Sequence, residues 1–321
     1  MDFLANYFGS LNPMSFLSAL PGNIAQGIIW GLMGLGVFLT FKLLNFADLS
    51  VDGSFATGGA VTAVMLINGC PVWATIIVAI LAGLAAGLVT GLLHTLLGIP
   101  DILAGILTQI ALYSINLNIM GKSNLPISYR NYTLVVSASN INMAILVGLG
   151  ICAVVIAAMY WYFGTEQGST IRSTGSNPAM SKAQGININF TKVIALALSN
   201  GLVALSGSLF AQYQGFADIN MGRGAIVIGL AAVIIGEVLG EAIFRKHMNF
   251  IIRMLFVIVG GILYYIAMGI VLWLKMPTDD TKLFTAIIVA IFLAVPYLQK
   301  KRKTSFKKVA KINAKNAHKE G

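Results

Sequence analysis

The sequence predicts an all-α membrane protein, a polytopic bundle of about nine transmembrane helices (roughly eight to ten) that contains an inverted internal repeat. Hydrophobic residues make up 57% of the 321 residues and charged residues only 10%, whereas about a quarter of a soluble domain is charged. Apolar segments of membrane-crossing length follow one another along nearly the whole chain. One stretch near the N-terminus is also matched by a second stretch far along the chain. These observations exclude an ordinary soluble protein.

Nine segments are candidate spans, because about 20 apolar residues cross the hydrocarbon core. The second and seventh are short, so we expect them to be tilted, broken or partly buried. The spans form one transmembrane domain over residues 23–298. Residues 1–22 lack the basic start and the cleavage site of a signal peptide; they are expected to be an interfacial segment, and make a tenth helix if they also cross. The candidate spans fall near residues 24–45, 54–69, 72–97, 101–120, 143–163, 191–214, 224–241, 250–274 and 282–298.

Basic residues determine the expected orientation. Placing the loop 164–190 inside puts about sixteen of the 21 basic residues inside, as the positive-inside rule requires. Nine of them lie in the tail, 299–321, which is expected to be cytoplasmic and to contact anionic membrane lipid. The tail has no interleaved aromatic residues that could stack on bases, so nucleic acid is not an expected partner.

Two stretches align without gaps, Ile29–Asp48 and Ser199–Asp218. They share a glycine, three leucines and the whole Phe-Ala-Asp triplet, which ends at Asp48 in one copy and at Asp218 in the other. Five spans separate the two starts, an odd number, so the copies would insert in opposite directions. Inverted repeats are a common way to build a transporter whose midplane site opens to each side in turn. The repeat therefore favours transport over membrane-bound catalysis.

A polar stretch, Ser173–Ile188, lies between two long apolar segments. It predicts a short helix outside the bilayer, in which Ser176 or Asn177 caps the N-terminus, Pro178 suits the first turn and Gly185 suits the C-terminal exit. A solvated loop is the alternative. A membrane protein keeps such a helix when a soluble partner binds it.

The run Gly175–Asn187, the following Thr191–Val193 and the helical stretch Asn200–Ala211 resemble the coupling-loop signature of bacterial ABC importer permeases. The resemblance is to the branched-chain amino acid, ribose and nucleoside permease superfamily, and is closest to a poorly characterised subgroup assigned to aromatic or other amino acids. It covers residues 24–298 and is most specific over 173–240. It implies that the short helix sits in a groove of an ATPase subunit, with these residues as the coupling contacts: Ser176, Asn177, Ala179, Lys182, Ala183 and Gly185.

The resemblance also implies the partners and the mechanism. An ABC ATPase subunit, an extracytoplasmic solute-binding protein and a second permease copy, identical or a close paralogue, would work with this chain in the bacterial plasma (inner) membrane. The solute, expected to be an amino acid, would enter by alternating access driven by the separate ATPase. A sugar or a nucleoside is the alternative substrate. An ion-coupled secondary transporter and an integral-membrane enzyme are the alternative functions.

Polar residues inside spans indicate where a solute path could run, because they are costly in hydrocarbon. Gln109, Tyr113 and Asn116 follow i, i+4, i+7 spacing and so share one helix face. Asn200 and Gln212 belong to a polar stripe on the sixth span. All five are candidates for the translocation path, although a hydrogen bond to a neighbouring helix would explain each one equally well.

The chain carries no expected catalytic residues, metal site or cofactor. His94, His247 and His318 are scattered, and the sequence contains no phosphate-binding loop or hydrolase motif. ATP hydrolysis would therefore reside on a separate chain. Asp48 and Asp52 are expected in the inner loop that follows the first copy of the repeat.

Overall fold

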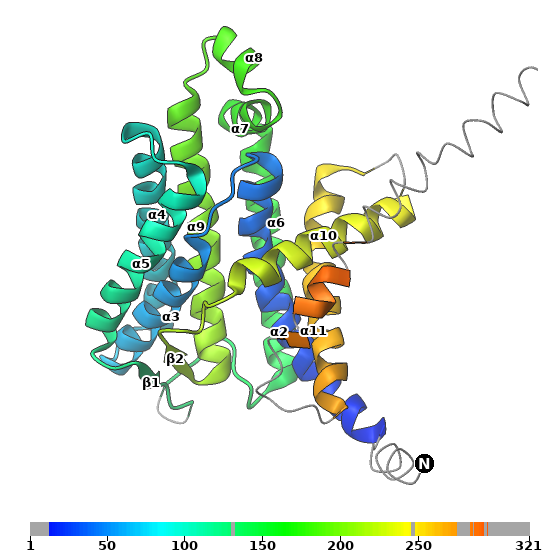
Figure 1. The fold of residues 1–321 in the computed structure, drawn as a ribbon. Coiled ribbons are helices and arrows are strands. Elements are labelled where there is room, and N and C mark those ends of the chain that lie inside the picture. The colour runs from blue at the N-terminus through cyan, green and yellow to red at the C-terminus, as the bar shows by residue number, and fades with distance from the viewer. Residues whose placement is uncertain are drawn as a thin grey trace, which may run out of the picture.

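The computed structural model describes residues 13–129, 132–244 and 248–274, together with 283–284, 286–291 and 294. Over these residues the protein is a bundle of helices with one short two-stranded antiparallel ribbon (Figure 1). The elements follow one another as α2 (Pro13–Val37), which continues into the π-helix η1 (Phe38–Leu43), α3 (Val51–Ile67), α4 (Val72–Leu96), α5 (Asp101–Met120), β1 (Asn124–Pro126), α6 (Ile141–Gly164), α7 (Glu166–Ser176), α8 (Pro178–Ala183), α9 (Ile188–Gln214), β2 (Phe216–Asp218), α10 (Ala225–Phe244) and α11 (Phe250–Trp273).

Seven helices in the described part of the chain are long and apolar enough to cross a membrane. The predicted all-helical membrane fold is thus confirmed. The number of membrane-crossing helices in the described residues is seven, whereas nine spans were expected for the chain. In place of the second expected span the chain forms α3, which has only 17 residues. Of the ninth expected span, 282–298, only residues 283–284, 286–291 and 294 are described, and the whole tail, 299–321, lies outside the described residues. The boundary expected at residue 22 falls inside α2, which begins at Pro13.

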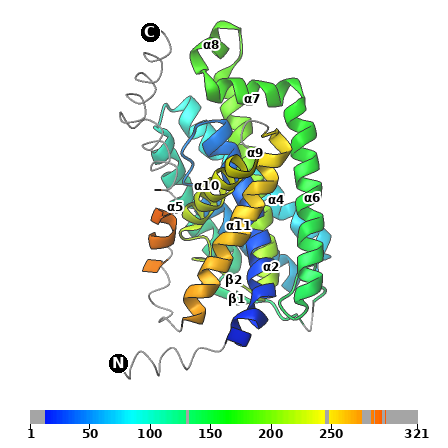
Figure 2. The same cartoon turned by 90° about the vertical axis from the view of Figure 1, so that its right-hand side faces the viewer.

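The central helix of the bundle is α9, with α2, α3 and α4 packed around it (Figures 1 and 2). Glycines permit these close contacts. A Cβ atom on Gly58 of α3 would collide with the backbone of Ala204, and one on Gly207 of α9 would collide with the backbone of Phe55. Lipid tails give no hydrophobic drive for helix association, so close backbone approach at small residues is what stabilises such interfaces.

The chain does not form a simple loop after the first span. From the end of η1 it runs back along the bundle without helical structure until α3 begins at Val51 (Figure 1). Phe46 and Asp48 are buried in this segment, and Gly105 of α5 packs on the backbone of Leu49. Irregular backbone is tolerated at membrane depth only where protein surrounds it. Asp48 lies in the connection after the first copy of the repeat, as expected, but it is 2% exposed, so this connection is enclosed by protein and is not a solvated loop.

The two ends of the bundle differ in structure. Helices α7 and α8 project from one end, which we call the α8 end, and strands β1 and β2 lie at the opposite end, which we call the ribbon end (Figures 1 and 2). At the ribbon end Asn124 pairs with Asp218 and Pro126 pairs with Phe216 in antiparallel register. The ribbon thus joins the connection after α5 to the connection after α9.

Candidate functional site

The polar stretch contains the predicted short helix, observed as α8. Asn177, rather than Ser176, caps it: the Met180 backbone N–H donates to Asn177 Oδ1 at 3.1 Å. Pro178 occupies the first turn, where its missing N–H costs nothing. Gly185 has φ +82°, a left-handed conformation that ends the helix. The helix is shorter than expected, and Ser176 is the last residue of the preceding α7.

One side of α8 is free in the described chain. Ala179, Lys182 and Ala183 are exposed, and Met180 is 57% exposed. Ser181 is only 1% exposed, so the opposite side faces the protein. A small apolar face with one cation, held at the tip of the molecule, is suited to insertion into a groove of another protein. The role of these residues as ATPase contacts stays a prediction.

Helix α7 attaches α8 to the membrane helices. Gly175 of α7 lies directly against the backbone of Leu43 at the end of η1, so that a Cβ atom there would collide with it. Arg172 lies over the ring of Phe250, 5.9 Å from its centroid, at the start of α11. Ile171 is 1% exposed. A displacement of α8 would therefore reach the first and the last of the described long helices through packed contacts.

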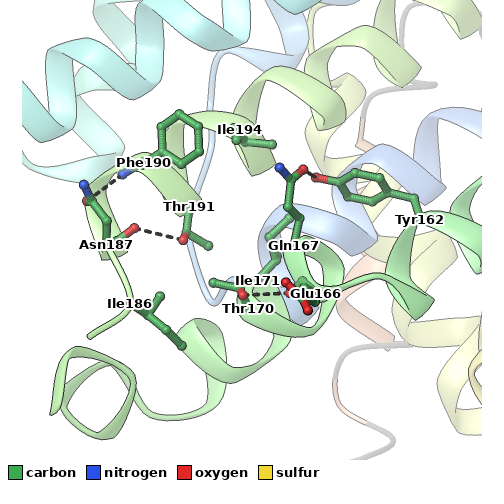
Figure 3. Close-up of a pocket in the computed structure, with 10 residues that line it drawn as sticks. All are labelled: Tyr162, Glu166, Gln167, Thr170, Ile171, Ile186, Asn187, Phe190, Thr191 and Ile194. Atoms are coloured by element: carbon green, nitrogen blue, oxygen red, sulfur yellow. Dashed lines mark hydrogen bonds between the residues drawn. The ribbon is translucent and has the colours of Figure 1, made fainter. Parts of the chain in front are cut away.

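A cavity of about 260 Å³ lies beside this attachment, between α7, the end of α6 and the first turns of α9 (Figure 3). Several of its polar side chains form hydrogen bonds within the protein. Tyr162 donates to Gln167 Oε1 at 3.4 Å, and Asn187 caps α9 by accepting the Phe190 N–H at 3.1 Å. The lining residues are Tyr162, Glu166, Gln167, Thr170, Ile171, Ile186, Asn187, Phe190, Thr191 and Ile194.

The polar face of α5 lines a second cavity, of about 310 Å³, between α3, α5 and the connection that leads from β2 into α10. We call it the α3–α5–α10 cavity. Gln109, Tyr113 and Asn116 all reach it, so the i, i+4, i+7 spacing brought these three residues to one place as predicted. The cavity also contains the side chains of Asp52 and Arg223, which the sequence reasoning did not include among the candidates.

Asp52 joins the starts of the two helices, α3 and α10, that follow the Phe-Ala-Asp triplets. It lies in the first turn of α3, and its carboxylate accepts the backbone N–H groups of Gly224 and Ile226, each at 2.9 Å. These two N–H groups belong to the start of α10, where an uncapped helix leaves donors without partners. Two helix N-termini thus converge on one carboxylate. The expectation that Asp52 lies in an inner loop is wrong.

The two candidates on α9 lie elsewhere. Asn200 is fully buried, and its Nδ2 donates to Asp48 Oδ2 at 2.8 Å. Asp48 also accepts from the Ser50 hydroxyl and backbone N–H. Asn200 therefore fixes the irregular segment before α3 to the central helix, and it does not line the α3–α5–α10 cavity.

Gln212 is also fully buried, near the ribbon end of α9. Its Oε1 accepts the Val135 backbone N–H at 3.0 Å, which attaches the connection between α5 and α6 to α9. Its Nε2 has no partner in the described structure. Gln212 does not line the α3–α5–α10 cavity. Its assignment to the solute path stays a prediction.

Gln212→Leu tests that assignment. The change removes the acceptor of the Val135 N–H, and an unpaired buried donor costs about 1–3 kcal/mol. We expect a lower melting temperature of the detergent-purified protein, with unchanged uptake kinetics in vesicles. Gln214→Leu, at an exposed position on the same helix, is the matched control. Altered uptake at wild-type stability would instead place Gln212 on the path.

Residues 22–296 match the family described as branched-chain amino acid transport system / permease component. The chain belongs to this family. It is the permease component of an ABC importer and is not itself catalytic.

Individual relatives agree with this assignment. The permease is 42% identical to the tyrosine transport system permease protein of Clostridioides difficile (strain R20291), over 93% of this chain and 99% of that protein. It is 27% identical to the D-allose transport system permease protein AlsC of Escherichia coli (strain K12), over 80% and 77% of the two chains. Its fold is similar to a chain in the structure of PsaBC from Streptococcus pneumoniae in complex with Fab, with a TM-score of 0.52, 16% identity and coverage of 91% and 94%.

Proposed function

We propose that this permease imports an amino acid, with tyrosine as the first candidate, across the bacterial plasma membrane. The observation that carries the proposal is the full-length similarity, at 42% identity, to a tyrosine transport system permease protein. The polar face of α5 supports it, because Gln109, Tyr113 and Asn116 line a cavity that also contains an acidic and a basic side chain. Such a lining suits a polar solute with charged groups.

The ATPase subunit docks on α8. Support comes from the exposed face of Ala179, Met180, Lys182 and Ala183, and from the packing of α7 on η1 and α11. The α8 end is therefore cytoplasmic, together with the C-terminal tail. The solute-binding protein delivers its cargo at the ribbon end, on the outer face.

A second permease copy, identical or paralogous, completes the path. Helix α5 supports this, because only 28% of the residues in its most hydrophobic 18-residue stretch are buried in a single chain. Its exposed apolar residues include Leu103, Leu107 and Ile110, which follow helical spacing and share a face with room for another protein surface. The path would then run between the two copies, along the polar residues of α5.

Alternating access is built on an inverted repeat of α2–η1–α3 and α9–β2–α10. The triplet aspartates behave alike in the two copies: Asp48 accepts the Ser50 N–H at 2.9 Å, and Asp218 accepts the Asn220 N–H at 2.7 Å. Helix α3, with 17 residues, follows the first triplet, and α10, with 20 residues, follows the second. Asp52 joins the starts of the two helices. Broken or short helices at equivalent places in two repeats are typical of substrate sites in transporters.

An uptake assay tests the proposed function. Proteoliposomes that contain the permease, its ATPase and its binding protein should accumulate labelled tyrosine only when ATP is supplied on the α8 side. D-Allose is the competing substrate, because a D-allose permease is among the relatives. ATP-dependent uptake of the sugar without uptake of any amino acid would overturn the substrate, and uptake driven by an ion gradient without ATP would indicate a secondary carrier.

Cysteine accessibility tests orientation and repeat together. In a variant with Cys70→Ser and Cys152→Ala, we expect Asn68→Cys, after α3, to react with an impermeant thiol reagent in intact cells. Glu241→Cys, near the end of α10, should react only after permeabilisation, because inverted copies end on opposite sides. Ser123→Cys (outside) and Ser169→Cys (inside, on α7) are the controls, and all four positions are exposed. Reaction of residues 68 and 241 from the same side would contradict the inverted repeat.

A further inference from the structure

The α3–α5–α10 cavity contains polar groups of both signs that no contact within the described protein fully uses. We infer that it binds the two charged ends of an amino-acid zwitterion, with the substrate carboxylate on Arg223 and the substrate ammonium group on the oxygens of Asn116 and Asp52. The inference rests on the proposed function, since it names the chemistry by which this permease would recognise its substrate.

Asn116 supplies the first observation. It is 1% exposed, its Nδ2 lies 3.5 Å from the Gly53 carbonyl oxygen, and its Oδ1 has no hydrogen-bond partner. The Gly53 carbonyl determines which end of the amide faces it, because a flipped amide would bring two acceptors together. A buried polar atom without a partner calls for an explanation. A ligand N–H in the cavity would provide the missing donor.

Asp52 supplies the second acceptor, next in sequence to Gly53. Each of its carboxylate oxygens accepts one backbone N–H from the start of α10, and each oxygen has room for another donor. The N-terminus of a helix carries about half a positive elementary charge. The N-termini of α3 and α10 together therefore offset the charge of Asp52, which acts mainly as a hydrogen-bond acceptor.

Arg223 then supplies the net charge of the cavity. It lines the cavity and is exposed in the single chain. The ion pairs within the described residues join Glu237 to Lys42 and to Arg253, so the Arg223 guanidinium is not paired there. A guanidinium binds a carboxylate through two parallel hydrogen bonds, which gives geometric specificity as well as charge.

The size and the remaining walls fit an amino acid. The volume of about 310 Å³ lies at the lower end of the roughly 300–1,000 Å³ range of small-molecule sites. Ile110 and Ile219 form an apolar wall, and Gln109 and Tyr113 add polar groups for a side chain. A neutral sugar would leave the charge of Arg223 unmatched.

A protection assay tests the inference directly. Ser114 lines the cavity and is exposed, so Ser114→Cys in the cysteine-free variant reports occupancy through its rate of reaction with a maleimide. In the assembled importer we expect tyrosine to slow this reaction. Tyramine, which lacks the carboxylate, and 3-(4-hydroxyphenyl)propionate, which lacks the ammonium group, should require concentrations about tenfold higher or more.

Variants assign each end of the substrate. Arg223→Gln should remove the advantage of tyrosine over tyramine and lower tyrosine uptake about tenfold, and Arg223→Lys should restore part of both. Asn116→Leu should remove the advantage of tyrosine over 3-(4-hydroxyphenyl)propionate. Lys122→Gln, which removes an exposed cation outside the cavity, is the matched control and should behave as wild type.

The outcomes separate this inference from the proposed function. If tyrosine is taken up but Arg223→Gln transports and discriminates like wild type, the zwitterion site is wrong and the importer assignment stands. Loss of binding-protein-stimulated ATP hydrolysis in Arg223→Gln would show that Arg223 acts in docking, which also overturns the site. If the wild type transports no amino acid, the proposed function itself fails.

Discussion

Replacing Ala179 and Ala183 together with glutamate is expected to abolish ATP-driven uptake and to leave the amount of membrane-inserted protein unchanged. The two residues are four apart on α8 and exposed, so the new side chains do not disturb the fold. They would enter the ATPase groove instead, where bulk and two unpaired charges are strongly unfavourable at a closely packed interface. The measurements are uptake, co-purification of the ATPase, and the amount of permease in isolated membranes.

A matched variant makes this result specific. Ser169→Glu with Asn189→Glu adds the same two charges at exposed positions on α7 and at the start of α9, the helices that flank α8. It should retain at least most of the uptake and should still co-purify with the ATPase. If both double variants lose the ATPase equally, α8 is not the principal contact. Normal uptake by the α8 variant would overturn the docking proposal.

Replacing Gly207 with valine is expected to prevent assembly of the bundle. A Cβ atom at this position would collide with the Phe55 carbonyl oxygen, and Gly58 meets the Ala204 backbone in the reciprocal contact. Backbone atoms cannot yield as a flexible side chain does, so α3 would have to leave α9. Overpacking costs about 1–3 kcal/mol when side chains can adjust, and we expect a larger loss here. Yield of monodisperse protein and melting temperature measure it.

Gly150→Ala is the control for Gly207. Gly150 lies in α6, and a Cβ atom there meets nothing within 4 Å. Alanine is favoured over glycine in a helix by about 1 kcal/mol, so this variant should be as stable as wild type or more so. A Gly207→Val protein that purifies with the wild-type melting temperature would show that α3 and α9 are less closely packed than described.

The sequence was sufficient for the position of most long helices, because hydropathy measures whether a segment of about 20 residues can enter hydrocarbon. It did not predict the return of the chain after η1. Residues such as Phe46 and Asp48 are buried there by neighbouring helices, and no local pattern distinguishes irregular backbone enclosed by protein from a surface loop. The buried position of Asp48 depends on Asn200, which is 152 residues away.

The candidate site was predicted in part for a related reason. Helical spacing brought Gln109, Tyr113 and Asn116 to one cavity, since residues on one face of one helix need no knowledge of tertiary structure. Asp52 comes from the first turn of α3 and Arg223 from the connection before α10, and both were missed. A signal was present: the second and seventh expected spans are both short and occupy equivalent places in the repeat, which indicates a substrate site between them.

The link between Asp52 and α10 has a consequence for how such a protein can vary. The donors are main-chain N–H groups, which every amino acid except proline possesses. The side chain at Ile226 is therefore free to change without loss of the link, while Gly224, with φ +85°, is restricted by its backbone conformation. In a collection of homologous sequences, selection for this contact should be visible as conservation of the acidic residue at position 52 and as an absence of proline at position 226. The residue types at positions 52 and 226 should not covary.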